Sequence, residues 1–309
     1  MKTNLLLALI LNVLFINCTK HNDPSVDQTY RFQKMLTVDG LSRTYTVNLP
    51  PNYYESNSYS VVIAMHGGGG SADQFESSCL LTNKANKEGF IVVYPEGVKS
   101  NGLLGARTWN AGNCCDYAVE QNIDDVHFIQ VLLDTLIANY KINPKKVCAT
   151  GHSNGGMMAY RLACEIPDRI AAIVPNGYTN ASSYCNPAQP VPVLHMHSMR
   201  DENVPYLGGR GGGIGTTQLN LLPVETTLKN WAAAAKCKVT AQIIVDDEKY
   251  KLTTWSECDQ NFVAKFYLTK DGGHAWPGAL PGSLIGDAPS KVINANDLLW
   301  QFFQEHQLK

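Results

Sequence analysis

The sequence lacks any run of basic residues and any large excess of one charge. Lys and Arg number 25 against 27 Asp and Glu, the formal net charge is −2, and the two signs are interleaved along the chain. Proteins that bind nucleic acids or anionic membrane surfaces concentrate Lys and Arg in patches. The charge pattern therefore argues against a nucleic-acid partner and favours a neutral or weakly charged substrate.

The N-terminal apolar stretch is too short to cross a bilayer. Leu5–Ile16 has 12 residues, whereas a membrane-spanning helix needs about 20. The positive Lys2 precedes it, as in a secretory signal peptide. The stretch is followed by Asn17-Cys18 in a pattern that resembles a bacterial lipoprotein cleavage site, although Gly, Ala or Ser is usual where Asn17 stands.

This N-terminal pattern predicts export. We expect residues 1–17 to be a cleaved signal peptide, Cys18 to become a lipidated N-terminus, and residues 19–28 to form a polar tether. One domain then covers residues 29–309. The mature protein would be secreted and lipid-anchored at the bacterial outer membrane or cell surface. Ordinary secretion to the periplasm or medium, with Cys18 discarded, is the alternative.

No cysteine spacing typical of a zinc site occurs among the nine cysteines. Without Cys18, an even set of eight in an exported protein suggests disulfides, although eight cysteines allow 105 pairings. The pairs expected first are Cys237–Cys258 and then Cys164–Cys185. The adjacent Cys114 and Cys115 are expected not to bridge each other, so each should have another partner or stay reduced.

Short apolar runs alternate with helical patterns along the chain, and no internal repeat occurs. Thr29–Val38 and Arg43–Leu49 flank the turn dipeptide Asp39-Gly40 and predict an antiparallel hairpin. The later apolar runs are unbroken, as in parallel strands buried on both faces: Val61–Met65, Ile91–Tyr94, Val147–Thr150, Ile170–Val174, Val191–Met196 and Phe262–Leu268. Helical patterns cover Asp124–Tyr140, Asn154–Glu165, Val224–Ala235 and Ser290–His306. The sequence therefore predicts an α/β fold with a mostly parallel, doubly wound sheet.

The motif Gly151-His152-Ser153-Asn154-Gly155 matches Gly-x-Ser-x-Gly and lies between a predicted strand and a predicted helix. That is the context of a nucleophile elbow, in which the serine occupies a sharp turn with no room for side chains at the flanking positions. The start of the following helix points its N–H groups towards a developing oxyanion. Ser153 is therefore the predicted nucleophile.

A serine nucleophile needs a base, and the base needs an orienting acid. In α/β-hydrolases these follow the serine in the order acid, then histidine. Asp201 lies just past the strand Val191–Met196 and is the predicted acid, with Glu202 as its rival. His274, in a glycine-rich loop after the last predicted strand, is the predicted base.

Two further histidines, His195 and His197, alternate on one strand and could chelate a metal ion. No carboxylate or third histidine is spaced to complete such a site, so we expect no metal.

The glycine run after the strand Val61–Met65, His66-Gly67-Gly68-Gly69-Gly70, suits an oxyanion loop. We predict the N–H groups of Gly68 and Asn154 as the oxyanion donors. A phosphate-binding loop is disfavoured, because no Gly-Lys-Ser/Thr follows the glycines.

Five ordered motifs resemble carbohydrate esterase family one and the related polyhydroxybutyrate-depolymerase-like esterases. They are His66-Gly67-Gly68, Thr108-Trp109-Asn110 with Asp124-Asp125-Val126, Gly151–Met157, His197-x-x-x-Asp201-x-x-Val204-Pro205-Tyr206, and Gly273-His274-x-Trp276-Pro277-Gly278. The likeness runs from about Tyr30 to the C-terminus. The chain departs from the family pattern at Ser198, where Gly is usual, and in the glycine-rich segment Gly208–Gly215.

This resemblance implies an α/β-hydrolase fold and hydrolysis of carboxylic esters without cofactor or metal. A feruloyl esterase acting on plant cell-wall xylan is expected first, and acetyl-xylan esterase or polyester depolymerase are the alternatives. Trp276 and Trp109 are candidate aromatic walls for a phenolic acyl group, with core packing as the alternative for both. A non-catalytic carbohydrate-binding lipoprotein and a peptidase remain as other classes.

Overall fold

The computed structural model describes residues 30–56, 58–103, 105–179, 189–212 and 219–308. The expected signal peptide, Cys18 and the tether lie outside the described residues, as does part of the glycine-rich segment. No helix in the described ranges is long and apolar enough to cross a membrane.

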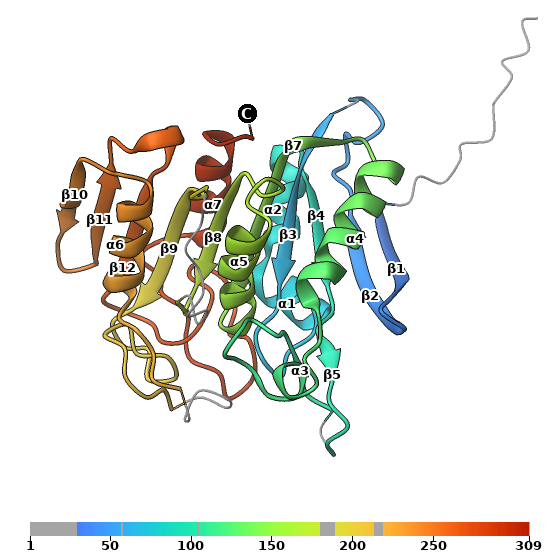
Figure 1. Cartoon of the computed structure of the whole chain (residues 1–309), viewed down its shortest axis with the longest axis horizontal. Helices are drawn as coiled ribbons and strands as arrows, with labels where there is room; N and C mark the ends of the chain where they lie inside the picture. The colour runs from blue at the N-terminus through green and yellow to red at the C-terminus, as the bar shows by residue number, and fades with distance from the viewer. Residues whose placement is uncertain (1–29, 57, 104, 180–188, 213–218, 309) are drawn as a thin grey trace, which may run out of the picture.

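A ten-stranded sheet forms the centre of the molecule, in the order β1-β2-β4-β3-β7-β8-β9-β12-β11-β10 (Figure 1). The neighbours from β4 to β12 are parallel, and the remaining pairs at both edges are antiparallel. The strands of this sheet are β1 (Arg31–Val38), β2 (Leu41–Asn48), β3 (Tyr59–Met65), β4 (Ile91–Pro95), β7 (Ile142–His152), β8 (Ala172–Asn176), β9 (Val193–Ser198), β10 (Val239–Asp246), β11 (Tyr250–Ser256) and β12 (Ala264–Thr269). The short strands β5 (Val98–Lys99) and β6 (Arg107–Thr108) form a separate ribbon.

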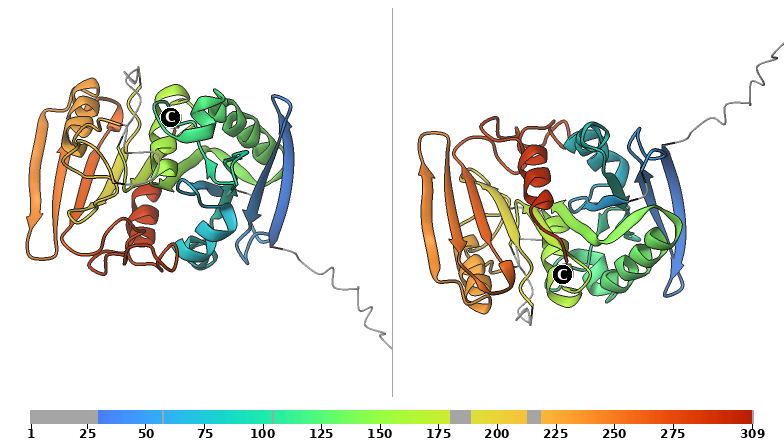
Figure 2. Two further views of the ribbon diagram at one scale, coloured as in Figure 1. Left: turned by 90° about the horizontal axis from the view of Figure 1, so that it is seen from below. Right: turned by 90° about the horizontal axis from the view of Figure 1, so that it is seen from above.

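Helices cover both faces of the sheet (Figure 2). On one face lie α4 (Asp125–Asn139), α5 (Asn154–Glu165) and α6 (Val224–Ala234); on the other lie α1 (Ala72–Cys79), α2 (Leu81–Glu88) and α7 (Ala295–Gln304). The short helix α3 (Asp116–Glu120) follows β6 in the chain. Two apolar cores result, one on each face of the sheet. The predicted α/β fold with a mostly parallel sheet and an N-terminal hairpin is confirmed.

The hairpin turn shows why the local pattern predicted it. Asp39 and Gly40 both have positive φ, 51° and 75°, as the tight turns between antiparallel strands require. All eight predicted strands and four predicted helices are present. The hairpin β10–β11 and the helices α1 and α2 were not predicted.

The cysteines correct part of the expectation. Cys237 and Cys258 are disulfide-bonded as predicted, and their bond ties together the two ends of the β10–β11 hairpin. The expectation for the adjacent pair was wrong, because Cys114 and Cys115 bond to each other across a cis peptide bond.

The remaining cysteines do not all pair. Cys79 and Cys148 are free and buried in the apolar core, where they pack as small hydrophobic side chains. The even set of eight thus does not pair completely, and neither of these two belonged to a pair that the sequence analysis named. Cys164 is disulfide-bonded, and its expected partner Cys185 lies outside the described residues.

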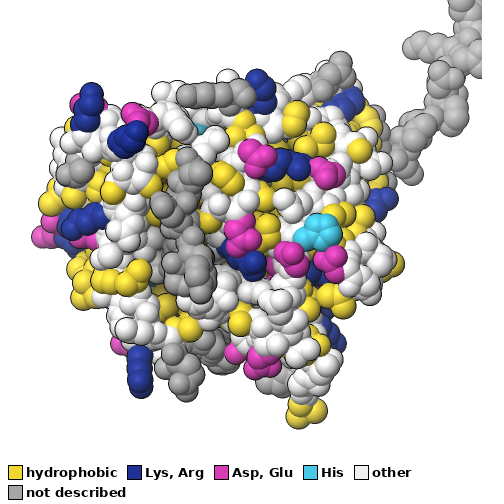
Figure 3. All heavy atoms as spheres, viewed as in Figure 1, with side chains coloured by type: hydrophobic (Ala, Val, Ile, Leu, Met, Phe, Trp, Pro, Cys, Tyr) yellow, Lys and Arg dark blue, Asp and Glu magenta, His cyan; other side chains and the backbone are white. Residues whose placement is uncertain are grey.

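Acidic and basic side chains are interspersed on the face shown in Figure 3. This arrangement agrees with the interleaving of charges along the sequence.

Candidate active site

The loops that follow the parallel strands meet at one end of the sheet, where they form a cleft of about 460 Å³. Of the predicted site residues, Gly68, Ser153, His274 and Trp276 line this cleft. They belong to the loops that follow β3, β7 and β12. These loops meet because the carboxyl ends of parallel strands lie at one edge of a sheet.

Ser153 occupies a strained turn between β7 and α5. Its φ of 54° and ψ of −122° lie in a region that residues with side chains rarely adopt. The N–H group of Ser153 donates to the Asn176 carbonyl oxygen over 2.9 Å, which joins the turn to β8. A methyl group at Gly155 would collide with the carbonyl oxygens of Met65 and His66, so glycine is required where α5 approaches β3. The local geometry is that of a nucleophile elbow.

His274 and Asp201 are in direct contact. The distance from His274 Nδ1 to Asp201 Oδ2 is 2.6 Å, and Asp201 Oδ1 accepts the Val204 N–H at 2.8 Å. The Asp201 side chain is 1% exposed and that of His274 is 12% exposed. Burial acts to raise the pKa of Asp201, but hydrogen bonds from His197 and His274 outweigh it and lower that pKa below its usual range.

An ionised Asp201 fixes the tautomer of His274. Because the carboxylate accepts, His274 Nδ1 carries the proton, and Nε2 is left to accept one from a nucleophile. The rival Glu202 is exposed, and its backbone carbonyl accepts the Gly212 N–H. Asp201, and not Glu202, is therefore the carboxylate that contacts His274.

The loop carrying His274 is held by groups that sequence reasoning missed. Asp287 Oδ2 accepts the His274 N–H at 2.7 Å. The Ser198 hydroxyl lies 3.1 Å and 3.0 Å from the carbonyl oxygens of Asp271 and Gly272, so this departure from the family pattern ties the end of β9 to the histidine loop. A hydroxyl at a strand end beside a glycine-rich loop was the only sequence signal for this contact.

His152, inside the elbow, lies beside His274. The centroids of the His152 and His274 rings are 4.5 Å apart. The Asn176 side-chain amide donates to His152 Nδ1 at 2.8 Å and to the Ala275 carbonyl oxygen at 3.0 Å. Burial, reinforced by the charge of nearby His274, lowers the pKa of His152 to about 3. His152 is therefore a neutral ring packed against His274.

The glycine loop after β3 lies against the elbow. A methyl group at Gly67 would lie 3.4 Å from Ser153 Cβ, and one at Gly68 would lie 3.8 Å from Asn154 Cβ. The Gly69 N–H donates to the Arg107 carbonyl oxygen, and the Gly70 N–H to that of Gly67. These bonds fix the loop next to the first turn of α5, which is where oxyanion donors are needed.

Trp109 contacts this loop from the protein core and does not line the cleft. Its side chain is fully buried, and its Nε1–H donates to the His66 carbonyl oxygen at 2.9 Å. The Asn154 side chain accepts from the Trp109 N–H at 2.7 Å and donates to the Trp109 carbonyl oxygen at 3.0 Å. The structure thus places Trp109 in the core, the alternative named for it. The Asn154 side chain therefore links the first turn of α5 to the backbone of Trp109.

Trp276 does reach the cleft wall. It is largely buried, packs edge-on against Phe75 with ring centroids 5.5 Å apart, and donates from Nε1 to Asn296 Oδ1. Phe75, Leu280 and Ile285 line the same cleft and add apolar surface to this wall.

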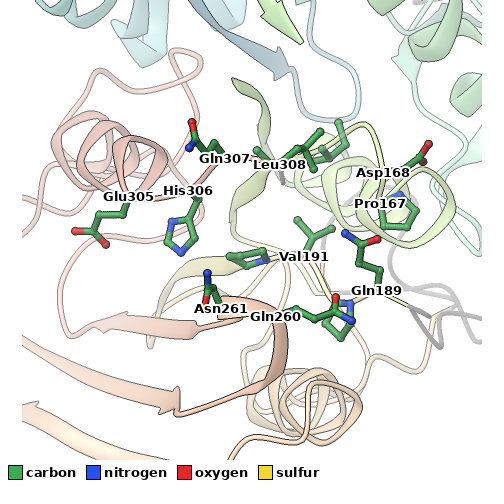
Figure 4. Close-up of a pocket in the computed structure, with 14 residues that line it drawn as sticks. Pro167, Asp168, Gln189, Val191, Gln260, Asn261, Glu305, His306, Gln307 and Leu308 are labelled. Atoms are coloured by element: carbon green, nitrogen blue, oxygen red, sulfur yellow. The ribbon is translucent and has the colours of Figure 1, made fainter. Parts of the chain in front are cut away.

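A larger cavity, of about 710 Å³, lies near the amino ends of β8 and β9, away from the cleft (Figure 4). Its labelled lining residues include Gln189, Gln260, Asn261 and Glu305, and its one histidine, His306, bonds through Nδ1 to the Phe302 carbonyl oxygen. No serine or cysteine stands among the described residues that line it, whereas Ser153 and His274 line the cleft described above.

Residues 40–237 match the family model described as "Putative esterase". The chain belongs to this esterase family. Members are carboxylic ester hydrolases, and the resemblance to carbohydrate esterase family one that the motifs carry is confirmed.

Relatives of this esterase include a feruloyl esterase and an acetylxylan esterase. The chain is 28% identical over 238 residues to feruloyl esterase B of Piromyces equi, covering 75% of this chain and 42% of that one. It is 26% identical over 241 residues to a bifunctional acetylxylan esterase/xylanase of Neocallimastix patriciarum, covering 76% and 31%. The chain thus spans less than half the length of either relative.

The fold comparison agrees. A solved acetyl xylan esterase from Aspergillus awamori superposes with a TM-score of 0.58 at 17% identity, covering 88% of this esterase and 99% of that protein. At this identity the likeness concerns the fold, and it confirms the α/β-hydrolase class.

Proposed function

We propose that this esterase hydrolyses plant cell-wall esters through Ser153, His274 and Asp201, with feruloyl esters of xylan as the first substrate class. The observation that carries the proposal is the shared cleft. A serine in a strained elbow and a histidine bonded to a buried carboxylate both face it, beside a glycine loop. Such a set has one chemical use in common, which is acyl transfer through a serine ester.

The mechanism follows from the proton positions. The Ser153 hydroxyl attacks the ester carbonyl carbon while His274 Nε2 takes its proton, and Asp201 stabilises the imidazolium that forms. The N–H groups of Gly68 and Asn154 are the proposed donors to the oxyanion of the tetrahedral intermediate. The intermediate collapses, the alcohol leaves with the proton from His274, and water then attacks the acyl-enzyme by the same route.

The cleft wall supports a phenolic acyl group. Trp276, Phe75, Leu280 and Ile285 provide apolar surface next to Ser153, which suits a flat ring better than an acetyl group. Acetylxylan esters are the second candidate, because one relative is named an acetylxylan esterase/xylanase. Short polyesters are a third within the same reaction class. A purely carbohydrate-binding role is disfavoured, since a binder gains nothing from backbone strain at Ser153.

Secretion with a lipid anchor at Cys18 remains part of the proposal, on the evidence of the leader sequence alone. A mass spectrum of the mature N-terminus tests it, and an N-terminus without acyl mass would limit the proposal to secretion.

The enzymatic proposal is tested with methyl ferulate and p-nitrophenyl acetate, using protein from Thr19 onward and Ser153→Ala as control. Ferulate release that depends on Ser153 supports the phenolic-ester assignment. Serine-dependent release of p-nitrophenol alone moves the assignment to acetyl-xylan or small polyesters. If folded protein cleaves neither ester, the binding-protein alternative takes the lead.

A further inference from the structure

A row of buried polar side chains runs from α5 through β9 to the proposed acid. The Tyr160 hydroxyl lies 2.9 Å from His195 Nδ1, and His195 Nε2 lies 3.1 Å from His197 Nδ1. His197 Nε2 lies 2.7 Å from the Val204 carbonyl oxygen and 3.3 Å from Asp201 Oδ2. Four side chains from two elements and a loop are thus linked in one chain that ends at the partner of His274.

The directions of these hydrogen bonds follow from the groups at the end. The Val204 carbonyl and the Asp201 carboxylate only accept, so His197 Nε2 carries a proton. In a neutral ring His197 Nδ1 then accepts from His195 Nε2–H, and His195 Nδ1 accepts from the Tyr160 hydroxyl. Burial lowers the pKa of His195 well below its usual value, which agrees with a neutral ring. Every donor in the row points towards Asp201.

The surroundings of the row are apolar. Tyr160 packs edge-on against Trp231, and His195 against Phe266. His195 and Tyr160 have no exposed surface, and His197 is 1% exposed. Burial of imidazole and phenol groups costs free energy unless each finds a partner, and aliphatic side chains would fill this space without that cost. Packing alone therefore does not account for the row.

The backbone of Val204 hydrogen-bonds to both Asp201 and His197. Its N–H donates to Asp201 Oδ1 and its carbonyl oxygen accepts from His197 Nε2, so one residue joins both side chains. We propose that His197, held in its tautomer by His195 and Tyr160, is a positioning residue that fixes the Asp201 carboxylate for His274. The role rests on the proposed function of the triad. No proton travels along the row.

Three variants test this role. His197→Phe keeps a ring but removes both nitrogens, whereas His197→Gln keeps a donor close to the Nε2 position. Tyr160→Phe removes only the hydroxyl at the far end. Tyr94→Phe is the matched control, because Tyr94 is also fully buried and hydrogen-bonded but lies in the core on the other face of the sheet.

We expect His197→Phe to lower kcat by roughly 10- to 100-fold at nearly unchanged KM, as a small misplacement of a catalytic group does. His197→Gln should recover most of that loss, and Tyr160→Phe should reduce kcat by more than Tyr94→Phe. The acidic limb of the kcat/KM profile should move to lower pH in His197→Phe, because a misplaced Asp201 stabilises the imidazolium less. The side chains facing Asp201 are His197 and His274, with His152 behind the latter.

A second readout separates this role from the proposed activity. The proton NMR resonance of His274 Nδ1–H reports its hydrogen bond to Asp201 whether or not a substrate is known. The chemical shift of this resonance should change in His197→Phe and keep its wild-type value in Tyr94→Phe. If His197→Phe does not fold, His197→Gln and Tyr160→Phe decide by the same two measurements. Wild-type kcat, pH profile and NMR resonance in the folded row variants would overturn the positioning role, whereas wild-type protein inactive on every ester would overturn only the proposed function.

Discussion

Asp201 Oδ2 and His274 Nδ1 lie 2.6 Å apart although the two residues are 73 positions apart in the chain. They meet because β9 and β12 are neighbouring parallel strands, paired in register from Val193 with Ala264 to Ser198 with Thr269. The loops that follow these strands therefore leave the sheet side by side. The sheet therefore positions Asp201 and His274, and the strained turn after β7 places Ser153 at the same edge.

Replacement of the acid by its amide is the first prediction. Asp201→Asn should lower kcat by about 10⁴-fold, because an amide can present an N–H to His274 Nδ1 and favour the wrong tautomer. Glu202→Gln is the matched control, since Glu202 is the exposed neighbour, and it should leave kcat unchanged. Steady-state kinetics on p-nitrophenyl acetate measures both. The reverse order of losses would transfer the acid role to Glu202.

The neighbourhood of Ser153, Asp201 and His274 could be predicted because each follows a strand whose unbroken apolar character marks it as buried. The row from Tyr160 to His197 could not, because its contacts depend on how α5 packs over β9, which no local pattern encodes. Trp109 was ambiguous for a similar reason. A tryptophan beside a catalytic motif has the same sequence signature whether it lines a cleft or lies beneath it.

Other misses have local causes. The helices α1 and α2 have eight residues each and few apolar side chains, so each is shorter than the window over which a helical period can be recognised. The hairpin β10–β11 lies at the sheet edge, and Ile243 and Ile244 are both about half exposed, which breaks the alternation expected of a half-buried strand.

The hydrogen bond from Trp109 to the start of the glycine loop gives the second prediction. Trp109→Phe removes the N–H that bonds the His66 carbonyl oxygen and should destabilise the fold by about 1–3 kcal/mol, the cost of a buried unsatisfied acceptor. Because the side chain does not line the cleft, KM for methyl ferulate should stay constant while kcat falls. Urea unfolding and steady-state kinetics measure the two effects. A rise in KM without loss of stability would restore Trp109 as a substrate wall.

The apolar cleft wall gives the third prediction. Ile285 lines the cleft yet is 98% exposed, so Ile285→Ser changes the wall with little effect on folding. It should raise KM for methyl ferulate by roughly tenfold, equivalent to about 1.4 kcal/mol of lost contact, and leave p-nitrophenyl acetate unaffected. Leu103→Ser is the control, since Leu103 is equally exposed and is not among the residues lining the cleft. Equal effects of Ile285→Ser on both esters would argue against a phenolic acyl site there.

The buried histidines make stability depend on pH, which is the last prediction. Burial lowers the pKa of His66 to about 4 and that of His152 to about 3, and it lowers that of His195 well below its usual value. In the unfolded chain all three titrate near about 6.5. Their contribution to the free energy of unfolding is therefore fully present above about pH 6.5 and is lost as the pH falls towards the folded values. Each group lowers that free energy by at most about 1.4 kcal/mol per pH unit.

Urea unfolding at pH 7.5, 6 and 5 should thus show a steep fall in stability on the acid side. His195→Phe should reduce the slope of the free energy of unfolding against pH by the equivalent of one proton, because one titrating group is then missing from the unfolded chain. His127→Gln should not reduce the slope, because the hydrogen bond to Asp39 raises the pKa of His127, and a raised pKa adds stability on the acid side instead of removing it. Equal free energies of unfolding at pH 7.5 and pH 5 would mean that these rings take up protons in the folded protein. A charged His152 would then lie against His274 and, as a like charge, would disfavour the imidazolium that the proposed mechanism forms.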